Sequence, residues 1–132
     1  RAVTAEQLGE LVDFISIDVA FISLDKVLPV ATTLLKNTGS LVALIKPQFE
    51  AGKEKVGKGG IVRERAVHEE VLSRILQVAY DCKLYLHGLT FSPIKGTEGN
   101  IEFLGYFTKS EEGALSITDE LIKAVVDEAH TL

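Results

Sequence analysis

Residues 41–46 read LVALIK, five consecutive apolar residues followed directly by a lysine. An unbroken apolar run of this length is typical of a strand that is buried on both faces of a sheet. Upstream, the stretch DFISIDV at residues 13–19 is rich in β-branched and aromatic residues, which also predicts a strand. Between them, apolar residues recur at helical spacing over residues 23–37, and Pro29 inside this pattern predicts either a kink or the true helix start. The centre of the fold is therefore predicted to be a strand–helix–strand unit.

The rest of the chain extends this alternation of strands and helices. The strongest helical pattern covers residues 64–81, and a second amphipathic helix is predicted over 117–130 with Ser116 as its cap. Two further strands are predicted at 84–91 and 101–108, with Gly105 as a bulge or a point of close approach. A short helical turn at 4–10 and a long glycine-containing loop at 47–62 complete the prediction. This order indicates an α/β fold with a mostly parallel sheet flanked by helices, whose last two strands are antiparallel neighbours.

Composition narrows the class of protein. The chain has 132 residues, 46% of them hydrophobic and 25% charged, which is typical of one globular domain and excludes intrinsic disorder. No apolar run approaches the roughly 20 residues that a membrane-spanning helix needs. One cysteine, Cys82, cannot form a disulfide scaffold and suits a cytoplasmic protein, and no signal peptide is recognisable. Because the first residue is Arg1 rather than methionine, we expect the chain to be part of a longer polypeptide.

The net charge of −5 conceals one basic segment. Residues 46–65 carry six basic and three acidic side chains, whereas the rest of the chain is acidic. This distribution excludes binding of nucleic acid through general surface charge but allows contact with a phosphate backbone at one edge. The alternative, a solvated loop whose lysines contact nothing, stays open at this point.

Three ionisable residues fall at predicted strand ends. Asp18 ends the first strand, Lys46 directly follows LVALI, and Glu102 opens the last strand. Open α/β sheets bind ligands beyond the carboxyl ends of their strands. Taken singly, Asp18 could cap a loop and Lys46 could point into solvent. Glu102 has apolar neighbours and therefore needs a partner for its charge, for which Lys46 is the obvious candidate. Together the three residues form a more informative candidate site than any one of them alone.

Other motifs point to no chemistry. The GKGG run at 57–60 lacks the pattern of a phosphate-binding P-loop, and no dinucleotide-binding GxGxxG occurs. His68, His87 and His130 are scattered without metal-ligand spacing, so structural roles are expected and no metal site is predicted. No serine–histidine pair or nucleophile elbow can be assembled.

Three stretches together carry a resemblance to a known family. IDVAFISLDKVLP, IKPQFEAGKEKVGKGGIVRERAVHEEVL and SPIKGTEGNIEF, within residues 13 to about 107, closely resemble the haemolysin A (TlyA) family of FtsJ-like ribosomal RNA methyltransferases. The resemblance implies an S-adenosylmethionine-dependent enzyme of Rossmann-like fold that methylates a ribose 2′-hydroxyl. It also implies a lysine–aspartate–lysine–glutamate tetrad, in which Asp18, Lys46 and Glu102 match the last three members and the first lysine would lie upstream of Arg1.

The resemblance also defines what this chain is expected to contain. Residues 1–132 look like the second half of the methyltransferase domain, without the cofactor-binding first half and the S4-type RNA-binding domain of the family. Asp18 and Val19 are the expected cofactor contacts, and ribosomal RNA or a ribosomal subunit is the expected partner. The chain alone is expected to be inactive and to bind S-adenosylmethionine poorly. It is also expected to self-associate through the edge strand 13–19, burying Phe14, Ile15 and Ile17.

Within the intact enzyme, Lys46 is the expected general base, oriented by Asp18 and Glu102. A base requires a neutral amine. Burial and a nearby sulfonium favour the neutral form of Lys46, whereas the two carboxylates favour the ammonium form, so which form prevails stays open at this point. The basic side chains of the loop are expected to contact RNA phosphates: Lys53, Lys55, Lys58 and Arg63. The alternatives are a membrane-active haemolysin, for which the glycine-rich basic segment is poorly suited, and a plain interaction module.

Overall fold

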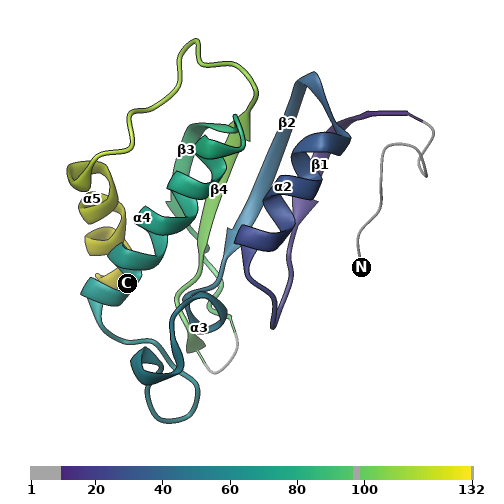
Figure 1. The fold of residues 1–132 in the computed structure, drawn as a ribbon. Helices are drawn as coiled ribbons and strands as arrows, with labels where there is room; N and C mark the ends of the chain where they lie inside the picture. Colours follow the sequence, from purple (N-terminus) through teal and green to yellow (C-terminus); the bar gives the residue numbers. More distant parts are fainter. Residues whose placement is uncertain (1–9, 97–98, 132) are drawn as a thin grey trace.

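The computed structural model describes residues 10–96 and 99–131, so residues 4–9 of the predicted first helical turn lie outside it. The described elements alternate along the chain much as expected (Figure 1). The strands are β1 (Val12–Ile17), β2 (Leu35–Ile45), β3 (Tyr85–Phe91) and β4 (Phe103–Thr108). The helices are α2 (Leu24–Leu34), α3 (Pro47–Glu50), α4 (Arg65–Asp81) and α5 (Asp119–His130), with a 3₁₀ turn at Lys53–Lys55. None of the helices in this described part is long and apolar enough to cross a membrane.

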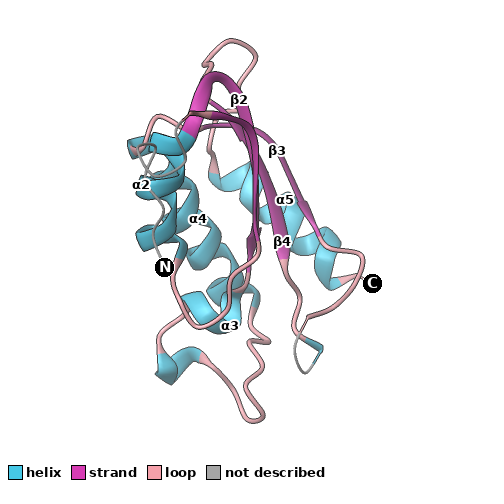
Figure 2. Ribbon diagram, turned by 90° about the vertical axis from the view of Figure 1, so that its right-hand side faces the viewer, coloured by secondary structure: helices cyan, strands magenta, loops and turns pink. Residues whose placement is uncertain are grey.

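The four strands form one sheet in the order β1-β2-β4-β3. β1 and β2 are parallel, and β4 is antiparallel to both β2 and β3, so β1, β2 and β3 all run in the same direction. Helices α2 and α4 lie on one side of this sheet, and α5 packs against α4 (Figure 2). The α/β class and the antiparallel final strand are thereby confirmed, and three of the four strands share one direction as expected, although only the β1–β2 pairing is parallel.

The core lies between the sheet and these helices. Alternate residues of β2, namely Leu41, Ala43 and Ile45, are fully buried on this face. Gly105 of β4 faces Ala43, and a Cβ at Gly105 would lie 2.7 Å from the Phe107 ring, so the close approach expected at this glycine is real. The other face of β2 is only half-buried at Val42 and Leu44, which corrects the expectation of full burial on both faces.

Helix α2 ends earlier than its periodicity predicts. The helical pattern extends to residue 37, but α2 ends at Leu34 and the chain turns at once into the long strand β2. Leu35 pairs with Val12 of β1, and its carbonyl accepts a hydrogen bond from Lys109 Nζ at 2.6 Å. These long-range partners override local helix propensity. Pro29 lies inside α2 and does not start it.

Two further boundaries differ from the prediction. Helix α5 starts at Asp119 with Thr118, not Ser116, as its cap, because the Thr118 hydroxyl accepts from the Leu121 amide at 3.1 Å. The predicted loop over 47–62 is partly ordered: it contains α3, the 3₁₀ turn and a bridge between Gly57 and Ile61.

Candidate active site

The sheet brings Asp18, Lys46 and Glu102 to one edge. Asp18 follows β1, Lys46 follows β2, and Glu102 precedes β4, which runs in the opposite direction. In the register of the sheet, Ile45 faces Phe103, so the residues after Ile45 and before Phe103 emerge at the same end. This end carries the carboxyl termini of the three parallel strands, where open α/β sheets place their ligands.

Lys46 and Asp18 form a direct ion pair. Lys46 Nζ lies 2.5 Å from Asp18 Oδ1, and the lysine side chain is 15% exposed while that of Asp18 is 65% exposed. The lysine is therefore held against the protein, and the carboxylate is open to a ligand. The extended backbone of Lys46, with φ −113° and ψ 97°, is the conformation that the following Pro47 imposes.

Glu102 is buried and contacts α3. Its residue is 5% exposed, and its Oε2 accepts a hydrogen bond from Gln48 Nε2 at 2.8 Å. This bond takes the place of the Lys46 partner expected from the sequence. Gly96 packs closely against the same carboxylate, because a Cβ at position 96 would lie only 1.9 Å from Glu102 Oε2. Gly96 is therefore a site at which even alanine would displace Glu102.

Gln48 has one amide atom bonded and one unsatisfied. Its Oε1 is buried without a hydrogen-bond partner, although Nε2 donates to Glu102. Reversing the amide would point Oε1 at a carboxylate, so the observed orientation is set by Glu102. A buried acceptor without a donor is costly, and a hydroxyl arriving beside it would remove that cost. Gln48 lies in the KPQF stretch noted in the sequence, but its role was not predicted.

Two aromatic rings, one exposed and one half-buried, lie on the segments that follow Asp18 and Lys46. Phe21, in the connection from β1 to α2, is 89% exposed and has a positive φ of 65°. Its ring lies 4.7 Å, centroid to centroid, from that of Phe49 on α3. A bulky residue at positive φ is a rare backbone conformation, and such strain tends to occur at functional sites. The sequence showed the phenylalanine but not this conformation.

Glu50 attaches α3 to two other helices. Its side chain is 3% exposed and accepts from Ser23 Oγ at 2.6 Å and from the Leu24 amide at 2.9 Å, at the start of α2. Arg74 of α4 lies 3.2 Å from the same carboxylate and donates to the Glu50 carbonyl at 2.6 Å. Because α3 follows Lys46 directly, these bonds also hold Lys46 and Gln48 in position.

The four predicted RNA-contacting residues are all exposed, but one of them is paired with an acidic side chain. Lys55 pairs with Glu70 of α4 at 2.5 Å, and this hydrogen bond raises the pKa of Lys55. Arg63 donates to the Lys58 carbonyl at 3.3 Å, which orders the turn between them. Lys53 lies in the 3₁₀ turn. The basic segment is thus divided between a paired lysine and cations that face solvent.

Two histidines that are far apart in the sequence contact each other. His68 Nδ1 lies 2.8 Å from His130 Nε2, and His68 Nε2 lies 3.1 Å from the Val62 carbonyl. Burial, followed by the nearby His130, lowers the pKa of His68 to about 4. Among the described residues, no group of three His, Cys, Asp or Glu could hold a metal ion.

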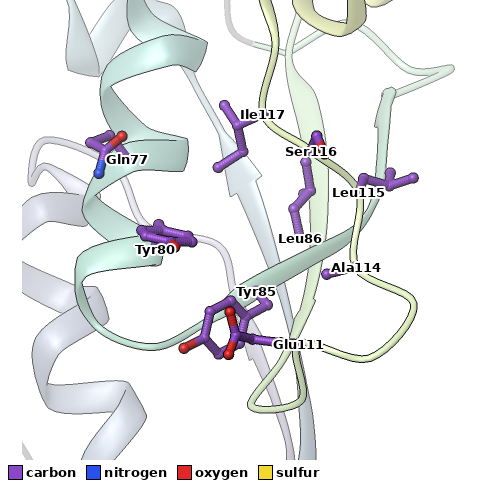
Figure 3. Close-up of a pocket in the computed structure, with 9 residues that line it drawn as sticks. All are labelled: Gln77, Tyr80, Tyr85, Leu86, Glu111, Ala114, Leu115, Ser116 and Ile117. Atoms are coloured by element: carbon purple, nitrogen blue, oxygen red, sulfur yellow. The ribbon is translucent and has the colours of Figure 1, made fainter.

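One surface pocket lies away from this edge. It has a volume of about 410 Å³ and is located where α4 ends and β3 begins (Figure 3). Because Lys46 follows the end of β2, which runs parallel to β3, the pocket lies at the opposite end of the sheet from Lys46. Tyr80 and Tyr85 line it with perpendicular rings whose centroids are 5.6 Å apart. None of the three strand-end residues contributes to it.

An open α/β sheet with helices packed on it carries a lysine and two carboxylates at the end where such sheets place their ligands. The chain belongs to the FtsJ-like methyltransferase family, whose family model matches residues 1–109. The resemblance noted in the sequence is thereby confirmed.

Individual relatives agree with this assignment. The chain is 49% identical over 124 residues to the candidate rRNA methyltransferase YqxC of Bacillus subtilis, covering 89% of this chain and 43% of that protein. It is 34% identical over 116 residues to the 16S/23S rRNA (cytidine-2′-O)-methyltransferase TlyA of Mycobacterium tuberculosis, covering 88% and 43%. A solved structure of a candidate hemolysin from Streptococcus thermophilus superposes with a TM-score of 0.87 at 45% identity, covering 98% of this chain and 46% of that one. The chain spans less than half the length of these proteins.

Proposed function

We propose that the intact protein transfers a methyl group from S-adenosylmethionine to a ribose 2′-hydroxyl of ribosomal RNA. We also propose that Asp18, Lys46 and Glu102 form its acid–base centre. The observation that carries the proposal is the Lys46–Asp18 ion pair of 2.5 Å at the carboxyl edge of the sheet, beside the buried Glu102. Membership of the FtsJ-like methyltransferase family and the names of the relatives support it.

Lys46 is the proposed base. In its neutral form, Nζ removes the proton of the ribose hydroxyl, and the ammonium that forms is stabilised by Asp18 at 2.5 Å. Glu102 and Gln48 are positioning residues: their 2.8 Å hydrogen bond fixes the start of α3 next to Lys46. Aligning the two reacting groups supplies on the order of 7–11 kcal/mol of the barrier in such reactions.

The exposed carboxylate of Asp18 suits a cationic methyl donor. Its side chain is 65% exposed and lies at the open end of an edge strand, with Val19 half-buried beside it. Asp18 and Val19 would hold one side of S-adenosylmethionine, which supplies an already activated methyl group when bound. We propose that the remaining cofactor contacts and an S4-type domain belong to other parts of the intact protein, since the chain spans 43% of YqxC.

RNA would approach the same edge. The exposed ring of Phe21 packs against the half-buried ring of Phe49, three residues after Lys46, and single-stranded RNA bases stack on such side chains. Lys53, Lys58 and Arg63 are exposed cations that would contact phosphates, with Lys55 contributing less because Glu70 neutralises it.

The direct test is Lys46→Ala in the intact protein. We expect methylation of ribosomal RNA to fall by about 100-fold or more, because general-base catalysis typically contributes about 10²–10⁴. Binding of S-adenosylmethionine, measured by calorimetry, should change little. The matched control is Lys26→Ala, which removes an exposed lysine of α2 and should leave the rate unchanged. Full activity of Lys46→Ala would contradict the proposal.

A further inference from the structure

A second pocket lies at the catalytic end of the sheet and is lined by cations. It has a volume of about 250 Å³, below the roughly 300–1,000 Å³ typical of small-molecule sites. Basic side chains reach it from three separate segments: Arg63, Lys95 and His130. Among the described residues that line it none is acidic, and the others are Ile61, Val62, Gly99, Ile101 and Ala129. A small anionic group fits this size and charge.

Hydrogen bonds determine where His130 can take up a proton. The Val62 carbonyl can only accept, so His68 Nε2, at 3.1 Å, must carry its hydrogen. Neutral His68 then has a bare Nδ1, which accepts from His130 Nε2 at 2.8 Å. His130 Nε2 is therefore protonated in both charge states, and Nδ1 is the atom that gains the proton when His130 becomes a cation.

The charges around His130 disfavour that cation while no anion is present. Burial, followed by the charge of Arg65, lowers the pKa of His130, and Lys95 adds to this effect. Asp127 acts in the opposite direction but is paired with Arg65 at 3.2 Å. An anion bound among these cations would instead favour the cationic form of His130, with the added proton on Nδ1.

The walls of the pocket are firmly held, and part of its rim is bare backbone. Asn100 is 1% exposed, accepts from the Val62 amide at 2.9 Å and donates to the Gly60 carbonyl at 2.9 Å. Gly99 lines the pocket with a positive φ of 86°, and a Cβ at this position would meet nothing within 4 Å. The backbone at this rim is thus open to a closely approaching group.

We propose that this pocket binds a phosphate group of the RNA backbone, held by Arg63, Lys95 and the protonated form of His130. The inference deepens the proposed function, on which it rests, by assigning the RNA a second contact point beside the catalytic edge. Ile101 lines the pocket and directly precedes the buried Glu102, so a phosphate here would lie at the same end of the sheet as the reaction centre. Because the bound form is protonated, binding should tighten as the pH falls from 7.5 to 6.

The test follows His130 by NMR in the histidine-labelled intact protein. Dimethyl phosphate and a ribosomal RNA fragment are titrated separately, and both should shift the His130 resonances and raise its measured pKa. The double variant R63Q/K95Q should abolish the response to dimethyl phosphate. In RNA binding measured by fluorescence anisotropy, this variant should lower the slope of log affinity against log salt by about 0.7 per lost contact. The control is K123Q, which changes a lysine that pairs with Glu69 away from the pocket.

The outcomes separate this inference from the proposed function. One contradicting outcome is that RNA is bound and methylated while the His130 resonances do not respond. Another is that R63Q/K95Q binds RNA as K123Q does. In either case the pocket is not an RNA contact and the inference is overturned. A response to dimethyl phosphate but not to RNA also overturns it, because the pocket would then be a site for small anions. If His130 responds to RNA but no methylation occurs, the inference stands and the proposed function fails.

Discussion

At the scale of single residues, Phe21 combines a strained backbone conformation with an exposed ring that can stack on an RNA base. Left-handed backbone costs a non-glycine residue about 1–2 kcal/mol, and an 89% exposed ring recovers little of this by burial. The ring pair with Phe49 contributes only about 0.5–1.5 kcal/mol. Phe21 is therefore close to neutral for stability, which makes a change at this position informative about RNA.

We predict that Phe21→Gly changes the free energy of unfolding by less than about 1 kcal/mol, because relief of strain offsets loss of the ring pair. RNA affinity should fall by about 1–3 kcal/mol, the amount typical of one stacked base. The variant Phe21→Tyr should keep the RNA affinity of the wild type, since tyrosine retains an aromatic ring. Fluorescence anisotropy and urea unfolding measure the two effects. Unchanged RNA affinity in the glycine variant would show that this ring contacts no base.

Buried His68 makes the stability of the fold depend on pH. Its pKa is lowered to about 4 in the folded protein, so below the ordinary value of 6.5 the unfolded chain binds a proton that the folded chain does not. The stability that neutral His68 contributes is therefore fully present above pH 6.5 and is lost as the pH falls towards 4. From pH 7 to pH 5 the loss from this residue should be about 2 kcal/mol.

The variant His68→Gln tests this dependence. Glutamine can still donate to the Val62 carbonyl and accept from His130, but it does not titrate. Urea unfolding at pH 7 and pH 5 should therefore show a smaller difference in this variant than in the wild type. An equal pH dependence in both proteins would rule out His68 as its source.

At the scale of elements, the short helix α3 depends on one buried carboxylate. Four residues cannot form a stable helix alone, and Glu50 connects α3 to the start of α2 and to Arg74 of α4. The position of Lys46, one residue before α3, follows from these contacts.

We predict that Glu50→Ala lowers the free energy of unfolding by about 3 kcal/mol, since it leaves buried donors and Arg74 without their acceptor. The control Glu70→Ala breaks an exposed pair with Lys55 and should cost less than about 1 kcal/mol. Urea unfolding at pH 7 compares the two. Equal losses in both variants would show that the Glu50 contacts do not connect the helices.

At the scale of the whole molecule, one face of the sheet has no helix packed on it within the described residues. Five apolar side chains lie on this open face and are half-buried or exposed: Phe14, Val42, Leu44, Leu104 and Tyr106. Among the strands that the structure describes, β1 is at the edge of the sheet, and the backbone groups on the outer side of such a strand can pair with another chain. The expected role of Ile17 in association is wrong, because Ile17 is 6% exposed and already part of the core. Ile15 also packs against the core, so of the three expected residues only Phe14 lies on the open face.

We predict that the 132-residue chain self-associates through β1 and the open face in a concentration-dependent manner. Phe14→Lys should shift the chain towards monomer, because a charge would then lie at the contact. Ile94→Lys, which alters a residue that is 77% exposed outside this face, is the control. Light scattering measures the mass, and a wild-type monomer at all concentrations would contradict the prediction. Calorimetry on the same sample should show little binding of S-adenosylmethionine.

The sequence alone determined the order of the four strands and the three longer helices, because hydrophobic periodicity is a local property of the chain, but it did not show the short helix α3. It also determined that Asp18, Lys46 and Glu102 flank strands, and the resemblance in KPQFEAG and GNIEF identified the family. Sequence periodicity could not place the end of α2, because the start of β2 is decided by pairing with β1 and by the Lys109 contact.

Only the tertiary structure decided which of these residues meet. Insertion of β4 between β2 and β3 places Glu102 against Gln48, 54 residues away, and packing of α5 on α4 brings His130 to His68, 62 residues away. The left-handed conformation of Phe21 and the contact of Gly96 with Glu102 likewise depend on neighbours that are distant in the chain or on the loop around them. Such contacts arise from hydrogen bonding and packing between elements, and local propensity carries no information about them.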